Sequence, residues 1–259
     1  ITRHGYARTR VSQAEALALE PALAASQSLW IGATYTQGDG SGDAKLWTQT
    51  LAELCQAQGV SFRFNETVQR LITNGKRVTG IGLAGQSTLL EADAVVVALG
   101  SYSAPLLRPL GLKIPVYPVK GYSATVPILD PTATPKVSIT DDAHKMVFTR
   151  MGNEFRIAGT AEFNGYDTTL SATRCDALLA RAKALFPKAA DYSNPTFWTG
   201  LRPATPSNCP LIGRTRMANL FLNTGHGTLG WTTGCGSGKA LAEIVSGQKP
   251  EVDFSFSGL

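Results

Sequence analysis

The sequence is poor in the side chains that bind metals through nitrogen or sulfur. Its 259 residues include only three histidines and four cysteines, and no two cysteines form a CxxC pair. Because a structural zinc site needs such ligands at short, regular spacings, we expect no metal site. Dispersed thiols are typical of a reduced, cytoplasmic protein. The cysteines are Cys55, Cys175, Cys209 and Cys235.

The chain also lacks a long apolar run and a run of like charges. Crossing a bilayer as a helix takes about 20 apolar residues, and the longest candidate, residues 92–100 (ADAVVVALG), predicts a buried strand instead. The formal net charge of +5 comes from dispersed basic residues. We therefore expect no nucleic-acid partner, whereas anionic lipids and anionic substrates both remain compatible with this charge.

A glycine-rich stretch near the end of the sequence is its most distinctive feature. Residues 219–238 read NLFLNTGHGTLGWTTGCGSG, and residues 236–247, GSGKALAEIVSG, continue as a helix-forming segment. A strand, a glycine turn and a helix in this order hold a nucleotide cofactor in many folds. Such a motif normally opens a dinucleotide-binding chain, whereas here it closes one.

Local signals predict two helices in the first quarter of the chain. Ser12 precedes a helix-forming stretch within residues 12–23 that a proline ends. Asp43 is placed to cap a second helix that continues to Gln58, and Gly59 ends it. One side of this second helix is apolar and consists of Leu46, Trp47, Leu51, Leu54 and Cys55.

Strand signals follow the second helix. Residues 60–65 (VSFRFN) alternate, and Asn74 and Gly75 separate two alternating runs, which predicts a hairpin. Residues 95–97 are three valines, a pattern typical of a strand that is buried on both faces of a parallel sheet.

The pattern changes at residue 114. Residues 114–128 and 144–163 predict strands without an intervening helix, the second forming a hairpin near Gly152, and a helix is expected over 171–186. We therefore predict an α/β fold in which an antiparallel domain is inserted into a Rossmann-like domain. The expected ranges are 1–113 and 201–259 for the discontinuous cofactor-binding domain, and 114–200 for the substrate-binding domain.

Several long segments together resemble a known family. They are residues 42–71, 96–107, 114–123, 197–213 and 219–247. In this order they are similar to the small subunits of D-amino acid dehydrogenases, in the flavin-dependent group that also holds glycine oxidase and sarcosine oxidase. The resemblance covers most of the chain and implies FAD as the cofactor, with residues 225–229 at its ring.

The resemblance also implies a segment that this sequence does not contain. Members of the family begin with a strand, a GxGxxG turn and a helix that hold the pyrophosphate, and no GxGxxG follows an early strand here. We expect the missing segment to comprise about 150 to 170 residues, the size of a small α/β domain. It would be supplied in the same polypeptide or by a second chain, and the fragment alone is expected to be inactive.

Arg202, in the segment TGLRPATP, is the first candidate for substrate binding. Its planar guanidinium matches a carboxylate through two charge-assisted hydrogen bonds, and the family has its carboxylate clamp in the matching G-x-R-P segment. A surface arginine beside a proline is the alternative. His226 is a second candidate, for which capping or packing beside glycines is the alternative.

The resemblance assigns two sets of residues to the flavin. Backbone N–H groups of a glycine turn would face the pyrimidine edge of the ring, where negative charge accumulates; this turn includes Gly225, Gly227, Thr228 and Leu229. Contacts on the adenine side would come mostly from backbone atoms of Val68, Ala98, Leu99 and Gly100.

Three residues of the inserted block are candidates for the substrate pocket. Tyr122, Met146 and Phe148 carry aromatic or soft apolar side chains that could enclose the side chain of an amino acid. Core packing explains them equally well.

The function implied by the resemblance is oxidative deamination of D-amino acids such as D-alanine. The products are 2-oxo acids and ammonia, and the electrons pass through FAD to a quinone or another respiratory acceptor. The location would be cytoplasmic, with peripheral contact at the inner face of the bacterial plasma membrane left open. Glycine oxidase, a hydroxyproline dehydrogenase-like flavoenzyme and an inactive fragment that needs a partner are the alternatives.

Overall fold

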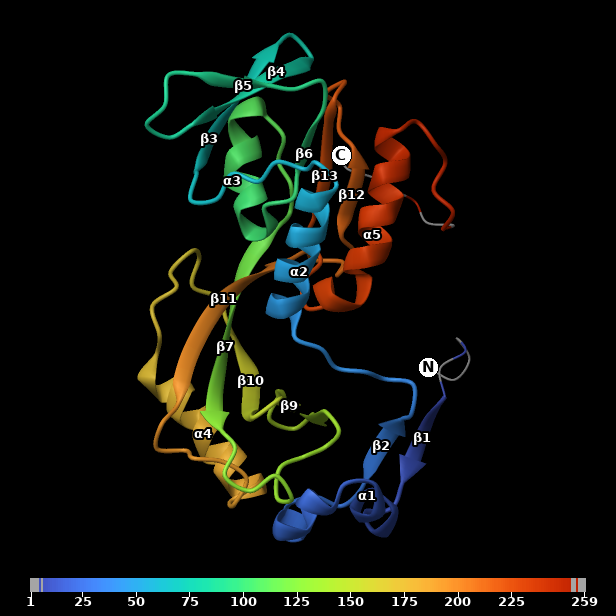
Figure 1. The fold of residues 1–259 in the computed structure, drawn as a ribbon, viewed down its shortest axis with the longest axis vertical. Coiled ribbons are helices and arrows are strands. Elements are labelled where there is room, and N and C mark those ends of the chain that lie inside the picture. The colour runs from blue at the N-terminus through green and yellow to red at the C-terminus, as the bar shows by residue number, and fades with distance from the viewer. Residues whose placement is uncertain (1–4, 6, 253–254, 256–259) are drawn as a thin grey trace. The chain divides into compact units, whose positions relative to one another are not determined.

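The computed structural model describes residues 5, 7–252 and 255, and these residues form two compact units (Figure 1). Unit 1 contains the residues up to Leu51 together with Lys120–Glu162 and Asp167–Gly200. Unit 2 contains Ala52–Val119, Phe163–Tyr166 and the residues from Leu201 onward. The described residues have no helix that is long and apolar enough to cross a membrane.

Unit 1 is built around a five-stranded antiparallel sheet with the strand order β11-β7-β10-β9-β8. Two of its strands, β7 and β11, continue into unit 2. The sheet strands and the helix α4 are β7 (Tyr117–Pro127), β8 (Ile139–Asp141), β9 (Met146–Met151), β10 (Glu154–Glu162), α4 (Ala172–Leu185) and β11 (Thr196–Ala204). The N-terminal elements are β1 (Arg8–Val11), α1 (Gln13–Leu19), the 3-10 helix η2 (Pro21–Leu29) and β2 (Ala33–Thr36).

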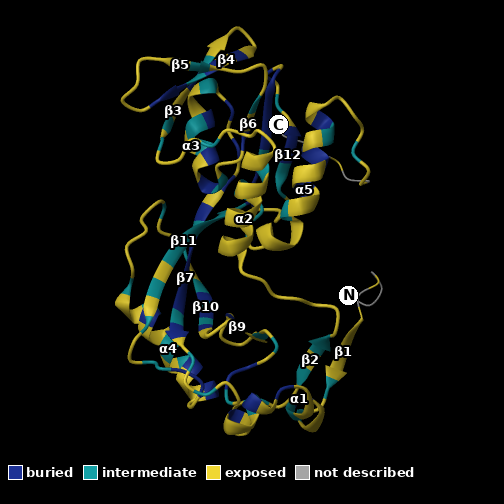
Figure 2. Cartoon of the chain, viewed as in Figure 1, coloured by how far each residue is buried: buried dark blue, intermediate teal, exposed yellow. Residues whose placement is uncertain are grey.

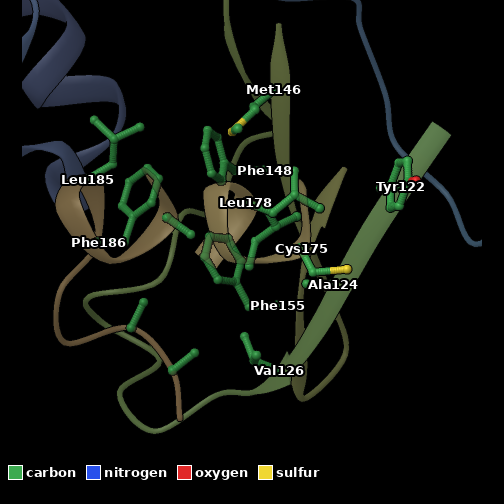
Figure 3. Packing of buried hydrophobic residues seen from close by; sticks show 14 of the residues in the cluster. Tyr122, Ala124, Val126, Met146, Phe148, Phe155, Cys175, Leu178, Leu185 and Phe186 are labelled. Carbon is green, nitrogen blue, oxygen red and sulfur yellow. The ribbon is translucent and has the colours of Figure 1, made fainter. Parts of the chain in front are cut away.

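The core of unit 1 lies between this sheet and α4. Phe148 and Phe155 from neighbouring strands pack against Phe186, with ring centroids 5.5–6.2 Å apart, and α4 contributes Leu178 and Leu185 (Figure 3). Burying each large aromatic side chain stabilises the unit by about 1.5–3 kcal/mol relative to leaving it exposed. The aromatic cluster therefore fixes β9, β10 and α4 as one body.

Unit 2 contains a mixed three-stranded sheet, β12-β13-β6, and an antiparallel sheet, β3-β4-β5. β13 pairs with β6 in parallel and with β12 in antiparallel orientation. The strands are β3 (Val68–Asn74), β4 (Arg77–Leu83), β5 (Leu89–Glu91), β6 (Val95–Val97), β12 (Leu211–Arg214) and β13 (Leu220–Thr224). The helices are η3 (Gly100–Tyr102), α3 (Ser103–Leu107), η4 (Arg108–Leu110) and α5 (Gly230–Val245), and α2 (Ala44–Ala57) begins in unit 1 and ends in unit 2.

A buried asparagine connects the two sheets of unit 2. The Asn219 side chain donates to the carbonyls of Val78 and Asp93, each at 2.8 Å, and accepts from the Val78 N–H at 2.8 Å. Asn219 is 4% exposed, so losing these bonds would leave buried polar groups unsatisfied. This network fixes the β3–β4 hairpin beside the parallel strands.

The helix and hairpin predictions from local signals are confirmed. Ser12 caps α1 in a capping box with Glu15, and the Asp43 carboxylate accepts from the N–H groups of Lys45 and Leu46 at α2. The β3–β4 hairpin pairs Asn74 with Arg77, so its two loop residues lie one position later than predicted. The expected strand–helix order in 144–186 is also observed.

Two local predictions are wrong. Residues 60–65 form no strand. The rings of Phe62 and Phe64 nevertheless lie on the same side of the chain and stack with centroids 5.6 Å apart. The last helix begins at Gly230 and not near Gly236, so several of the glycines assigned to a loop are helical.

The contacts also group residues differently from the predicted ranges. Residues up to Leu51 belong to the unit with the antiparallel sheet, whereas we expected 1–113 to fold together. One physical reason is Glu20, which is 2% exposed and accepts from the N–H groups of Lys136 and Val137, at 2.5 and 3.0 Å. The assignment of cofactor and substrate domains stays a prediction, and the outermost residues of those ranges lie outside the described residues.

The helix α2 has no buried residue, and most of its residues are exposed (Figure 2). Its apolar side includes Leu46 and Leu54, which are 62% and 61% exposed. In β6, Val96 is 44% exposed, although the valine run predicted a strand covered on both faces. Within the described residues, α2 and β6 thus present apolar side chains to solvent that sequence patterns predict to be buried.

Candidate functional site

The candidate site lies where the two parallel strands of unit 2 end. β6 ends at Val97 and β13 ends at Thr224, and because the strands are parallel, the segments that follow them emerge at the same edge. Ligands in α/β sheets bind at this carboxyl edge. The segments at this edge are the turn after β6, which contains Ala98, Leu99 and Gly100, and the glycine turn at residues 225–229.

Thr224 connects these two segments. Its hydroxyl donates to the Gly100 carbonyl at 2.9 Å and accepts from the Ser103 hydroxyl at 3.1 Å. Thr224 and Ser103 are 1% and 0% exposed. Buried hydrogen bonds with all partners satisfied hold their groups in one arrangement. The predicted adenine-side turn and the predicted ring-side turn are therefore parts of one rigid edge.

The end of β11 joins the same edge and carries Arg202. The N–H of Gly227 donates to the Pro203 carbonyl at 2.9 Å, and the Ser101 hydroxyl donates to the Leu201 carbonyl at 3.2 Å. The backbone on each side of Arg202 is thus bound to one of the two turns. Arg202 precedes a proline, which further restricts its backbone to extended conformations.

Arg202 is partly buried, and this burial lowers the pKa of its guanidinium. An arginine remains protonated at neutral pH even so. A cation that has lost part of its hydration attracts a carboxylate more strongly than one in bulk water. The side chain is suited to bind a small anion.

The two positive-φ glycines of the turn do different things. Gly225 has φ +83°, and a Cβ there would lie 2.8 Å from the Thr205 Cγ2 atom, so this position needs glycine for packing. Gly227 has φ +55°, and a Cβ there would meet no atom within 4 Å. The space in front of Gly227 is open, which lets a ligand approach the backbone closely.

The N-terminus of α5 continues this open surface. Leu229 is its N-cap and provides no side-chain hydrogen bond to the first turn. The N–H groups of a first turn lack intrahelical acceptors and carry partial positive charge. A Cβ added to Gly234 or Gly238 would also meet no atom within 4 Å. A flat, electron-accepting ring fits this arrangement of accessible backbone donors and small residues.

His226 turns toward α5. Its Nε2 lies 3.1 Å from the Ser237 hydroxyl, which donates to the Gly234 carbonyl at 3.0 Å. The Ser237 hydroxyl thus links the His226 ring to the backbone of α5. Burial lowers the pKa of His226, so the ring is neutral at pH 7. These contacts favour the packing alternative for His226.

The other predicted site residues lie elsewhere. Val68 begins β3 and pairs with Leu83, in the antiparallel sheet of unit 2. Met146 and Phe148 lie in the core of unit 1, 5% and 0% exposed, where packing already explains them (Figure 3). Their assignment to a pocket stays a prediction.

Tyr122 lies on β7, apart from Phe148 and Phe155 (Figure 3). It has a polar partner. Its hydroxyl donates to Glu162 at 2.5 Å, and Glu162 also pairs with the ammonium of Lys120 at 3.0 Å. Burial raises the pKa of Tyr122, and the bond to the Glu162 carboxylate raises it as well. The assignment of Tyr122 to a substrate pocket also stays a prediction.

Sequence reasoning missed the residues that hold the site together. Ser101, Ser103, Thr224 and Pro203 fix the three segments to one another. The only local signal was a cluster of small polar residues directly after an apolar strand. The partners of the three hydroxyl groups are 100 to 124 positions away, and Pro203 is 24 positions from Gly227, so no local pattern indicates them.

Comparisons with known proteins agree on one family. The model of the family described as "FAD dependent oxidoreductase" (DAO) matches residues 1–244. A D-amino acid dehydrogenase of Dechloromonas aromatica (strain RCB) is 52% identical over 255 residues, which are 97% of this chain and 61% of that protein. A D-amino acid dehydrogenase of Methylobacterium radiotolerans is 49% identical over 96% of this chain and 59% of its own.

A solved structure agrees as well. Glycine oxidase from Geobacillus kaustophilus matches the whole chain with a TM-score of 0.87 and 26% identity, over 68% of its own length. The chain spans about three fifths of the length of the two dehydrogenases that it matches.

Proposed function

Because the chain belongs to the FAD dependent oxidoreductase family, we propose that it provides the carboxylate-binding and flavin-ring parts of a D-amino acid dehydrogenase. The reaction converts a D-amino acid such as D-alanine to a 2-oxo acid and ammonia. The single observation that carries the proposal is the hydrogen-bonded edge that holds Arg202 and the open glycine turn together. Similarity to two D-amino acid dehydrogenases supports the choice of substrate.

In this proposal Arg202 binds the substrate carboxylate. Two parallel N–H···O bonds from a guanidinium fix both the position and the rotation of a carboxylate. Because the α-carbon is bonded directly to that carboxylate, the fork also orients the Cα–H bond. The substrate thus loses its translational and rotational entropy on binding, and this loss no longer adds to the barrier of the reaction.

The turn at residues 225–229 and the start of α5 hold the flavin ring. When bound, FAD supplies the acceptor for the hydride that leaves Cα. The chain contributes backbone N–H groups, which stabilise the negative charge that the ring gains. The edge is held by Thr224 and Ser103, so these donors need little reorganisation during the reaction.

The substrate must lose a proton from nitrogen before or during hydride loss. The Nε2 atom of His226 faces the Ser237 hydroxyl at 3.1 Å, and His226 acts as a packing residue in this scheme. Binding the carboxylate next to a guanidinium that is partly withdrawn from water favours a substrate with a neutral amine, because a second cation nearby is repelled.

The reduced cofactor passes its electrons to a quinone or another respiratory acceptor in this scheme. A membrane-dissolved acceptor would require peripheral contact at the inner face of the plasma membrane. The net charge of +5 is compatible with attraction to anionic lipid.

Flavin loading in this scheme requires a further segment with a phosphate-binding glycine turn. The exposed Val96 on β6 and the exposed apolar side of α2 support it, because both are patterned for burial. The segment is in the same polypeptide or in a partner chain.

A panel of amino acids tests the proposed substrate. The flavin-loaded protein should reduce an artificial dye in the presence of D-alanine and other D-amino acids, with L-alanine as the matched control. Turnover of only the L-enantiomers would refute the proposal.

Glycine oxidation is the second candidate, favoured by the structural match to glycine oxidase. In the same panel, glycine as the best substrate with oxygen as the best acceptor would select it. D-alanine with a dye or quinone as the best pair would select the dehydrogenase.

A further inference from the structure

Ser101 occupies a buried position beside Arg202. It is 3% exposed, lies in the short helix η3, and donates from its hydroxyl to the Leu201 carbonyl at 3.2 Å. That carbonyl belongs to the peptide group whose nitrogen is the Arg202 nitrogen. Because a peptide group is planar, a bond to its oxygen also orients the Cα atom of Arg202.

Tyr166 in turn holds Ser101. The Tyr166 hydroxyl donates to the Ser101 carbonyl at 2.9 Å, and its ring contacts Tyr102 with centroids 5.3 Å apart. Burial raises the pKa of Tyr166, so its hydroxyl keeps its proton across the physiological range.

The segment that carries Tyr166 is itself anchored within unit 2. The Gly165 N–H donates to the Tyr117 hydroxyl at 3.3 Å. The rings of Phe163 and Tyr117 lie 5.7 Å apart, centroid to centroid. A loop residue held at two neighbouring positions loses little conformational entropy when it makes one more hydrogen bond. Tyr166 is 42% exposed, and the contacts of its segment with Tyr117 hold its hydroxyl near the Ser101 carbonyl.

The geometry points to Ser101 as a positioning residue for Arg202, with Tyr166 holding Ser101 in place. This inference rests on the proposed function, in which Arg202 binds the substrate carboxylate. The relay is Tyr166 hydroxyl to Ser101 carbonyl, then Ser101 hydroxyl to Leu201 carbonyl. It acts on one side of Arg202, and the bond from Gly227 to Pro203 acts on the other.

The relay has a specific consequence for substrate affinity. Losing the Ser101 bond leaves the guanidinium chemically intact but widens the range of positions from which it reaches the carboxylate. We expect a weaker Michaelis complex and an almost unchanged chemical step. One ordinary hydrogen bond corresponds to about a five-fold change in an equilibrium constant.

The test uses Ser101→Ala and Tyr166→Phe in the flavin-loaded protein. Each should raise KM for D-alanine about five-fold while kcat and flavin content change less than about two-fold. Tyr102→Phe is the matched control, because the Tyr102 hydroxyl makes no hydrogen bond within the described residues and the substitution keeps the ring. Its KM should equal that of the parent.

A double variant separates positioning from general loosening. In an Arg202→Ala background, Ser101→Ala should add no further increase in KM, because the group that it positions has been removed. A further increase of similar size in that background would overturn the inference. The inference would also be overturned if Ser101→Ala and Tyr166→Phe had the same KM and the same rate of amide hydrogen exchange as Tyr102→Phe.

A readout that does not depend on turnover separates this inference from the proposed function. Amide hydrogen exchange in residues 201–205 should be faster in Ser101→Ala and Tyr166→Phe than in the parent and in Tyr102→Phe. If the parent oxidises no D-amino acid, the proposed function fails and exchange alone decides the relay. If the parent is active but neither exchange nor KM responds, the relay fails and the proposed function stands.

Discussion

At the scale of single residues, the candidate site depends on side chains that can be recognised in the sequence and on contacts between residues that are distant in the sequence. Arg202 is identifiable from the sequence because an arginine two residues after a glycine and directly before a proline matches a segment of the family. Its backbone is defined by Ser101 and Gly227, whose partners are 100 and 24 positions away, from Ser101 to Leu201 and from Gly227 to Pro203. A local pattern contains no information about contacts at such separations.

Arg202 offers the most direct test at this scale. Arg202→Ala should raise KM for a D-amino acid strongly, a loss of about 2–5 kcal/mol for truncating one partner of a desolvated charge pair. Arg202→Lys should also bind poorly, because a point charge cannot form the two-bonded fork. Flavin content should stay near that of the parent. A KM unchanged in Arg202→Ala would remove the residue from the site.

Gly227 tests the flavin-ring assignment. Gly227→Val should lower flavin retention or the reduction potential of the flavin more than His226→Ala does, because the backbone at Gly227 is open to a ligand. Gly227→Asn is the control for strain, since asparagine tolerates the φ of +55° better than valine. Full flavin retention and an unchanged potential in all three variants would contradict the assignment.

At the scale of elements, sequence patterns predicted where helices and hairpins form better than they predicted which of their residues are buried. Ser12 and Asp43 indicate the correct helix starts, and Asn74 and Gly75 indicate the hairpin loop to within one position, because caps and turns are set by neighbouring residues. The last helix was predicted too short, because glycine disfavours helices and the contacts of Phe221 and Leu241 that hold α5 are tertiary. Residues 60–65 alternate like a strand, but a strand needs a partner, and the described residues provide none.

The ion pair that joins β8 to α4 gives a pH prediction. Burial raises the pKa of Asp141, but hydrogen bonds from Arg181 at 2.7 Å and from His144 outweigh this effect and hold the pKa below its ordinary value. The folded state therefore gains stability that is complete above the unfolded-state pKa and is lost as the pH falls through the folded value.

Asp141→Asn should consequently lower the free energy of unfolding at pH 7 by about 1–3 kcal/mol. Urea unfolding measures this change as a lower midpoint concentration. The difference from the parent should shrink as the pH falls below about 4, where the unfolded chain binds a proton at this carboxylate, and further as the pH passes the lower pKa of the folded protein. Asp142→Asn is the matched control, because the Asp142 side chain is 91% exposed. Equal effects of the two substitutions, or a difference that does not change with pH, would refute the role of this pair.

At the scale of the whole molecule, the chain combines the proposed carboxylate-binding segment with apolar side chains that are exposed to solvent. α2 and β6 expose side chains that are patterned for burial, and the sequence lacks an early GxGxxG turn. Exposed apolar surface of this kind favours association. The chain spans about three fifths of the length of two related dehydrogenases, and the proposed flavin loading depends on a segment that covers this surface.

One measurement tests the central claim most directly, namely the flavin absorbance spectrum recorded without oxygen before and after addition of D-alanine. It would be made on residues 1–259 alone and on the same residues joined to the part of the Dechloromonas relative that lies outside the matched region. The joined protein should carry about one flavin per chain, and D-alanine but not L-alanine should bleach its absorbance, while residues 1–259 alone should carry little flavin. A joined protein that holds flavin but is not bleached by D-alanine would contradict the proposed function, and full flavin loading of residues 1–259 alone would contradict the need for a covering segment.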